Sequence, residues 1–118
     1  MTGPPLVDRA VIDDLFEQIG AEAVRSVLAL FVGEAQAYRA TIAEAAAQAA
    51  DPALCERARR AAHSLKSGAG QIGAASLSAA AAAVERAAAE GALELARAAA
   101  ALDRCAAETM EGLSPFLD

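Results

Sequence analysis

The stretch Ala58–Gly73, which reads ARRAAHSLKSGAGQIG, decides how the chain is organised. Its apolar residues recur at the spacing of one helical face, and Gly73 interrupts the pattern. We therefore predict a helix over Pro52–Gln71 that turns this face toward a core. The residues of the face are Leu54, Ala58, Ala61, Leu65 and Ile72. The stretch also holds the only histidine of the sequence, His63, and the only lysine, Lys66, three positions later.

The rest of the chain is rich in alanine, the residue with the highest helix propensity, and Gly and Pro interrupt it at few places. We predict four further helices, at about Asp8–Ile19, Ala21–Ala50, Ala75–Glu90 and Leu93–Gly112. Short connections between long helices favour antiparallel neighbours. The expected fold class is therefore all-α, an antiparallel up-down four-helix bundle with a short additional N-terminal helix, forming a single domain over residues 1–118.

Composition and charge exclude several classes of protein. A net charge of −6 and a pI of about 4.7 argue against nucleic-acid binding, which needs clustered Lys and Arg. Alanine supplies most of the apolar content, and no stretch reaches the ~20 large apolar residues of a membrane span. The N-terminus lacks the pattern of a secretory signal, so we expect a cytoplasmic protein. Cys55 and Cys105 are too few for a disulfide framework and lack metal-ligand spacing.

Positive charge is nevertheless concentrated around the histidine. Four of the ten basic residues lie within ten positions, at Arg57, Arg59, Arg60 and Lys66. An acidic protein with one such local cluster is expected to bind a small anionic group there, rather than a polyanion.

The helical pattern also predicts the direction of His63. At about 100° per residue, His63 lies roughly 200° from both Ala61 and Leu65, so it points to solvent. One interpretation is that His63 is a simple solvated side chain. A metal site is not indicated, because no second metal ligand stands four positions later. However, Gly68 and Gly70 each cost the helix about 1 kcal/mol relative to alanine. Clearance for a partner's surface to reach the imidazole offers a reason for both glycines.

A carboxylate is expected at the same height as the histidine. In an antiparallel hairpin whose turn centres near Ala74, His63 and Glu85 are equally distant from the turn. Glu85 can accept a hydrogen bond from Nδ1–H of His63, which leaves Nε2 as a free nucleophile. The alternative for Glu85 is a solvated residue that pairs locally along its own helix.

An exposed neutral imidazole of this kind is a nucleophile toward phosphorus. Lys66 can supply positive charge to a phosphoryl group, and Arg59 and Arg60 can pair with an acidic partner's carboxylates or with the phosphoryl group itself. The sequence has no glycine-rich nucleotide loop, no aspartate-rich metal cluster and no second catalytic base. Any phosphoryl group is therefore expected to come from a partner and to leave to one.

These residues resemble the histidine-containing phosphotransfer (HPt) domain family. LFEQIG and VRSVLALFVGEA resemble its N-terminal helices, AAHSLKSGAGQIGAASL its signature, and AVERAAAEG the helix that follows. The resemblance implies a four-helix bundle whose exposed histidine carries phosphate between receiver-domain aspartates, or from a histidine kinase to a receiver. By position, His63 is the phosphoacceptor and Lys66 assists its phosphorylated form. Glu85 falls where chemotaxis kinases place an acid bonded to the histidine ring and where other members place glutamine.

The resemblance also suggests docking residues. Gly68 and Gly70 resemble the small residues that let a receiver approach, whereas Ser67 stands where the family more often has glycine. Docking is expected to survive this change, with altered partner preference. Apolar docking candidates near the histidine are Ile12, Leu15, Phe16 and Ala62. No cofactor or metal is expected on this chain, because a receiver brings its own Mg²⁺.

The expected partners are a response-regulator receiver domain and a sensor or hybrid histidine kinase. One alternative is a helical adaptor that binds and inhibits such a partner without carrying phosphate. Another is the excised phosphotransfer domain of a chemotaxis-type kinase, although a chain that runs from Met1 to SPFLD fits a stand-alone protein better. A charged outer surface favours a monomer, and the alanine-rich composition is typical of a GC-rich bacterial genome.

Overall fold

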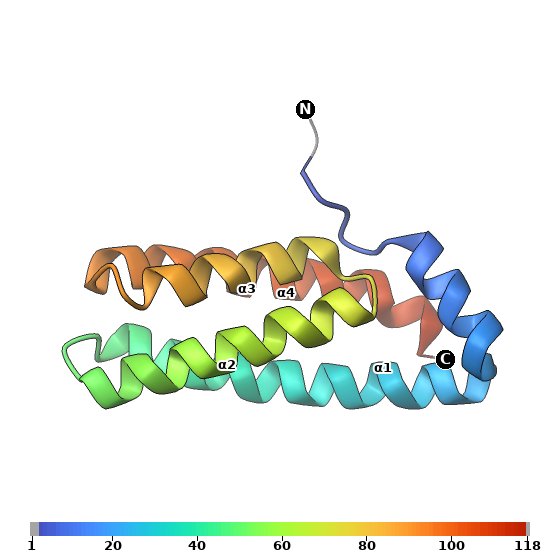
Figure 1. Cartoon of the computed structure of the whole chain (residues 1–118), viewed down its shortest axis with the longest axis horizontal. Coiled ribbons are helices and arrows are strands. Elements are labelled where there is room, and N and C mark those ends of the chain that lie inside the picture. Colours follow the sequence, from blue (N-terminus) through green and yellow to red (C-terminus); the bar gives the residue numbers. More distant parts are fainter. Residues whose placement is uncertain (1–2, 118) are drawn as a thin grey trace.

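The chain forms an all-helical structure, seen in a computed structural model that describes residues 3–117 (Figure 1). Within these residues there are four α-helices and one short 3-10 helix and no strand. Their bounds are α1 Arg9–Ala47, α2 Pro52–Gln71, α3 Ala75–Ala87, α4 Ala92–Leu113 and η1 Ser114–Phe116. Helix α1 packs against α2, α2 against α3, α3 against α4, and α4 against α1. The four helices therefore enclose a single core.

Helix α1 changes direction at Gly20, where the sequence pattern places a boundary between two helices. Gly20 has φ 83° and ψ 163°, a conformation that residues with a Cβ rarely adopt. The helical element nevertheless runs from Arg9 to Ala47, so the two segments predicted there are two arms of α1. Figure 1 shows the first arm, in dark blue, at an angle to the second.

The first arm of α1 packs against the C-terminal end of the chain. Its Ile12 is fully buried in the core. Phe16 packs on Phe116 of η1 with 6.3 Å between ring centroids, and the guanidinium of Arg9 lies 5.2 Å from the centroid of the same ring. Apolar and cation–π contacts together hold this arm in place.

The turn between α2 and α3 is held tightly by the N-terminal segment. Gly73 has φ 82°, and a Cβ there would lie 2.9 Å from the Cβ of Val11, so only glycine fits. The N–H of Asp8 donates to the carbonyl of Gly73 at 2.7 Å, and the N–H of Ser76 donates to Pro5 at 2.8 Å. Because the turn is fixed, the relative height of residues on α2 and α3 is fixed as well.

The core consists largely of alanine with leucine, isoleucine and valine between them. Alanines at contact positions let the helix backbones approach closely, at the cost of less apolar area per residue. Val27 follows the helical apolar spacing of α1, which is typical of a buried position, but it is 40% exposed. It lies about 100° around α1 from the fully buried Leu28, beyond the arc that the neighbouring helices cover.

None of the helices within residues 3–117 combines the length and the apolar character needed to cross a membrane.

Candidate functional site

His63 projects outward from the middle of α2, and 58% of its side chain is exposed. The two residues used to predict its direction, Ala61 and Leu65, are both buried. The predicted outward orientation of His63 is therefore confirmed. It follows directly from α2 burying one face against α1 and α3.

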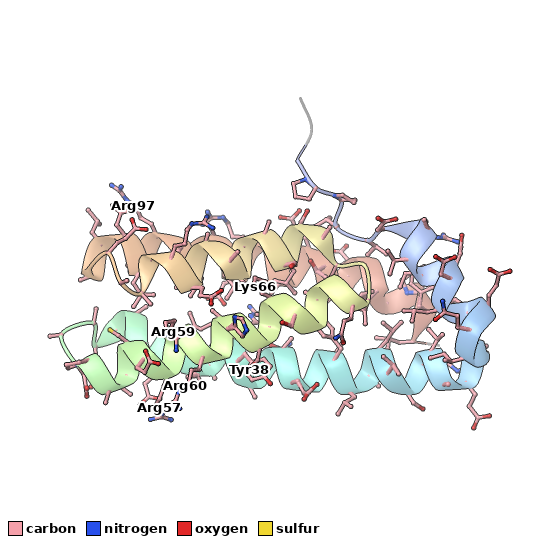
Figure 2. The ribbon with its side chains drawn as sticks, in the orientation of Figure 1. Tyr38, Arg57, Arg59, Arg60, Lys66 and Arg97 are labelled. Atoms are coloured by element: carbon pink, nitrogen blue, oxygen red, sulfur yellow. The ribbon has the colours of Figure 1, made fainter. Side chains whose placement is uncertain are left out.

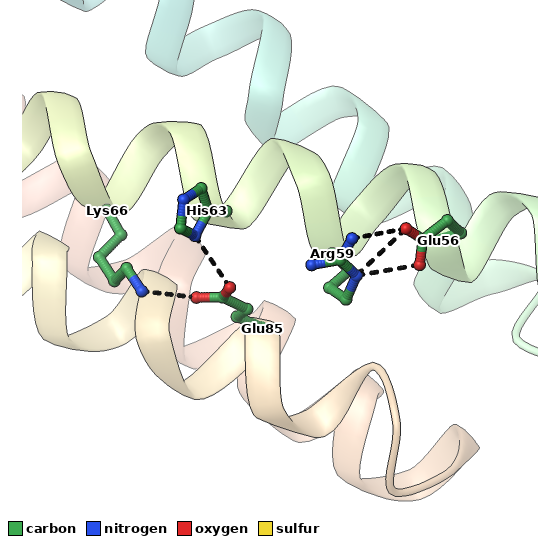
Figure 3. A network of polar contacts seen from close by, with 5 residues as sticks. All are labelled: Glu56, Arg59, His63, Lys66 and Glu85. Atoms are coloured by element: carbon green, nitrogen blue, oxygen red, sulfur yellow. Dashed lines mark hydrogen bonds and ion pairs between the residues drawn. The ribbon is translucent and has the colours of Figure 1, made fainter.

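Glu85 on α3 reaches across to this histidine. Its Oε2 lies 2.9 Å from Nδ1 of His63, and its Oε1 accepts a hydrogen bond of 2.8 Å from Nζ of Lys66 (Figure 3). One carboxylate thus binds both side chains, and the predicted contact with His63 is confirmed. A carboxylate is an acceptor, so this geometry favours the tautomer with hydrogen on Nδ1 and a free electron pair on Nε2.

A second contact between α2 and α3 supports this arrangement. The hydroxyl of Ser78 on α3 donates to the backbone carbonyl of Lys66 at 2.9 Å. Together with the fixed turn at Gly73, this bond sets the height of α3 against α2. The position of Glu85 beside His63 is therefore set by the packing of α3 against α2 as well as by the rotamer of Glu85.

The electrostatics of the site keep Glu85 ionised. The hydrogen bond from Lys66 is the largest cause that lowers the pKa of Glu85 below its ordinary value of 4.5. The hydrogen bond with His63 lowers the pKa further, against the opposing effect of burial. At neutral pH the carboxylate therefore acts only as an acceptor and carries a negative charge beside the imidazole.

The arginines before His63 differ in their availability. Arg59 is held by Glu56, whose Oε1 lies 2.6 Å from Nη2 of Arg59 (Figure 3). This pairing raises the pKa of Arg59 and lowers the pKa of Glu56. Both arginines line a concavity together with His63 and Glu85, but Arg60 makes no ion pair within the described part of the chain. The freely available guanidinium group next to the histidine is that of Arg60.

A groove of about 340 Å³ runs along the other side of the histidine, between α1 and α2. Its lining residues from α1 are Phe31, Glu34 and Tyr38, and those from α2 are His63, Ser64, Leu65, Ser67, Gly68 and Gln71. The sequence does not predict the three α1 residues at this site, because the helical spacing of Phe31 and Tyr38 is equally typical of core positions. Tyr38 is half-buried, and its place in the aromatic and apolar pattern of α1 gave no sign of a second role.

The small residues after the histidine lie where the sequence predicts. Ser67 and Gly70 are exposed and Gly68 is half-buried. A Cβ on Gly68 would lie 3.5 Å from the Phe31 ring, an ordinary contact, so packing alone does not require glycine there. The role of Gly68 and Gly70 in admitting a partner stays a prediction.

The predicted apolar docking residues need correction. Ala62 is fully buried, because it lies about 60° from the core position Leu65, and it has no surface to offer a partner. Ile12 is also fully buried, and Leu15 and Phe16 are half-buried. Exposed apolar side chains lie instead on α1, at Val27 with 40% and Leu30 with 65% exposure. At helical spacing from Phe31 and Glu34, they continue the α1 side of the groove.

Within residues 3–117, no three His, Cys, Asp or Glu side chains gather as metal ligands do. The arrangement can perform nucleophilic chemistry at one exposed imidazole nitrogen. Its supporting groups are a fixed negative charge at Nδ1, an ammonium group held by the same carboxylate, and a free guanidinium group at Arg60.

Comparison with protein families places most of the chain in a known domain family. A model of the Hpt domain matches residues 26–113, which cover more than half of the chain and include His63, Lys66 and Glu85. The match leaves out the first arm of α1. No curated protein and no solved structure matches the sequence.

Proposed function

The chain belongs to the Hpt domain family and has a role in histidine phosphotransfer within a phosphorelay, and we propose that its phosphoacceptor is His63. The phosphoryl group arrives from a histidine kinase or from a receiver-domain aspartate, and leaves to the aspartate of a response-regulator receiver. The single observation that carries this proposal is an exposed imidazole whose Nδ1 lies 2.9 Å from a carboxylate, which directs the lone pair of Nε2 to solvent.

The proposed reaction has two displacement steps. In the first, the Nε2 lone pair attacks the phosphorus of the donor, a P–N bond forms, and the bond from phosphorus to the donor's nitrogen or oxygen breaks. The Nδ1 proton stays on the ring in its hydrogen bond to Glu85, so the carboxylate balances the positive charge of the phosphorylated imidazole. In the second, a carboxylate oxygen of the receiver attacks phosphorus, and the P–N electron pair returns to Nε2.

Lys66 is proposed to stabilise the phosphorylated state. Its Nζ is 2.8 Å from Glu85, one helical turn from the imidazole, so a small rotation brings it toward a phosphoryl group on Nε2. A protein promotes phosphoryl transfer mainly by positioning the reacting groups and by placing positive charge near the phosphoryl oxygens. Arg60 is placed to offer a second positive charge, either to the phosphoryl group or to the partner's carboxylates.

Several finer points belong to the same proposal. The chain acts as a phosphocarrier without kinase activity of its own. It works as a monomer in the cytoplasm, together with its partners. The Mg²⁺ ion that the transfer needs is bound by the receiver. The chain folds as one domain, supported by Ile12 lying in the common core although the family match begins at residue 26. The bundle is of the antiparallel up-down kind with a short N-terminal helix, supported by the short connections and the backbone break at Gly20.

Phosphoryl uptake tests the proposal. The protein is incubated with a panel of radiolabelled phosphorylated receiver domains, and the label on the protein is tested for stability in acid and alkali. We expect an acid-labile, alkali-stable label that is absent from a His63→Gln variant. Tight binding to a receiver with no label at any time would replace the phosphocarrier by a binding adaptor.

A further inference from the structure

A second depression lies beside the groove, at the end of α2 that precedes the histidine. It measures about 330 Å³, and its lining residues are Tyr38, Thr41, Arg57, Arg60, Ala61 and Ser64. Figure 2 shows Tyr38 on α1 and Arg57 and Arg60 on the adjoining stretch of α2. Arg57 and Arg60 are three positions apart and so lie on the same side of α2, where both guanidinium groups can contact a ligand bound beside the tyrosine.

The positive charge of this area is offset only through space by the protein's own carboxylates, since Glu56 interacts with Arg60 but makes its hydrogen bonds to Arg59. Arg57 and Arg60 make no ion pair among the described residues. On their own helix Glu56 pairs with Arg59, and on α3 Glu85 binds His63 and Lys66. Two free guanidinium groups side by side are therefore available to an external anion, on a protein whose net charge is −6.

The surface on the other side of His63 has a different character. Glu34 lines the groove there, and the exposed Val27 and Leu30 continue it along α1. A partner that reaches the imidazole therefore meets positive charge toward one end and an acidic and apolar surface toward the other. Such a polarised surface discriminates between two orientations of the same partner, since like charges that face each other are unfavourable.

We propose that Arg57, Arg60 and Tyr38 form a contact site for an acidic segment of the partner receiver, next to its phosphorylated aspartate, and that this contact selects the partner. The inference rests on the proposed phosphotransfer function. Arg57 precedes His63 by six residues, roughly 9 Å along the helix. A round patch of the ~800 Å² that each protein contributes to a stable interface has a radius of roughly 16 Å, so Arg57 lies within an interface centred on His63. A carboxylate-bearing segment complements two guanidinium groups, and the tyrosine ring supplies apolar area between them.

The experiment measures transfer rates from a phosphorylated receiver as a function of protein concentration and salt. The test variant is Arg57→Glu, and the matched control is Arg97→Glu, which makes the same charge change on α4, at another edge of the molecule in Figure 2. For the receivers that label the wild type best, we expect Arg57→Glu to raise the apparent KM about tenfold at low salt. We also expect a weaker salt dependence and little change in the maximal rate. Arg57→Lys should recover most of the loss, because the positive charge returns.

The outcomes separate this inference from the proposed function. If Arg57→Glu and Arg97→Glu give the same KM and the same salt dependence while the wild type is labelled, the contact site is wrong and the phosphocarrier stands. If no receiver labels the wild type, the phosphocarrier fails and the contact site fails with it. Circular dichroism of both variants establishes that the helices are intact, which is expected at two exposed positions.

Discussion

The carboxylate of Glu85 lies 2.9 Å from Nδ1 of His63, although 22 positions of sequence separate the two residues. The same carboxylate holds Lys66 at 2.8 Å. A single acidic side chain on α3 therefore orients the imidazole on α2 and holds the ammonium group of Lys66 beside it. The consequences of this relationship can be measured one residue at a time.

The first prediction concerns the histidine itself. His63→Gln removes the nucleophile but leaves an exposed polar side chain, so the free energy of unfolding should change by no more than about 0.5 kcal/mol. Phosphoryl uptake should be abolished. Thermal unfolding and labelling of the same preparation check both statements. A large loss of thermal stability would show that His63 has a structural role instead.

The second prediction concerns the role of Glu85 in transfer. Glu85→Ala removes the acceptor of Nδ1–H and should slow phosphoryl transfer about tenfold or more, because a hydrogen bond to a charged group is lost. Glu85→Gln keeps an acceptor oxygen without the charge, and its rate should lie between those of the wild type and Glu85→Ala. Stopped transfer time courses give the three rates. Equal rates in all three proteins would remove Glu85 from the site.

The third prediction concerns the pKa of Glu85. The hydrogen bond from Lys66 is the largest cause of the lowered pKa, so Lys66→Met should move that pKa back toward 4.5. The side-chain carboxyl carbon of Glu85 reports its titration by NMR. A pKa that stays unchanged in Lys66→Met would mean that the ion pair is absent in solution.

The same variant should shorten the lifetime of the phosphorylated protein, since Lys66 no longer offsets the charge of the phosphoryl group. The lifetime is followed as loss of the acid-labile label after the donor is removed. An unchanged lifetime together with an unchanged transfer rate would take Lys66 out of the mechanism.

The fourth prediction concerns stability at low pH. The pKa of Glu85 is lower in the folded protein than its ordinary value of 4.5, so its ionised form stabilises the fold. This contribution is complete above about pH 4.5 and is lost as the pH falls through the lowered pKa. The difference in free energy of unfolding between wild type and Glu85→Gln should therefore shrink in acid. Urea unfolding at a series of pH values measures it, and a difference independent of pH would contradict the assignment.

The fifth prediction concerns the turn that sets the height of Glu85 against His63. Gly73→Ala places a Cβ 2.9 Å from that of Val11 at φ 82°, and should destabilise the protein by about 2 kcal/mol. Gly33→Ala is the matched control, because Gly33 lies within α1 with nothing within 4 Å of its Cβ position. The control should be neutral or stabilising by up to about 1 kcal/mol. Similar unfolding midpoints for both variants would show that the turn is not constrained.

The parts of the site that lie on one helix or across one tight turn could be predicted from the sequence. His63 points outward because Ala61 and Leu65 point inward, and Glu85 meets it because Gly73 fixes the turn between their helices. Both predictions need only helical geometry and the position of a glycine.

The parts that depend on packing between helices far apart in the sequence could not be predicted. The groove residues Glu34 and Tyr38 reach the site only through the way in which α1 lies against α2. The burial of Ala62 depends on how far the neighbouring helices wrap around α2. The engagement of Arg59 by Glu56 is of another kind, because it is an i, i+3 pair on α2 that the spacing of the two residues in the sequence already indicates.

The central claim is that Nε2 of His63 carries the phosphoryl group while Nδ1 keeps its proton in a hydrogen bond to Glu85. The most direct test is NMR of protein with ¹⁵N-labelled histidine, recorded before and after incubation with a phosphorylated receiver. We predict a new coupling between phosphorus and Nε2, with the Nδ1–H signal retained. Phosphorus bonded to Nδ1, or an imidazole spectrum that no phosphorylated receiver or kinase changes, would contradict the account.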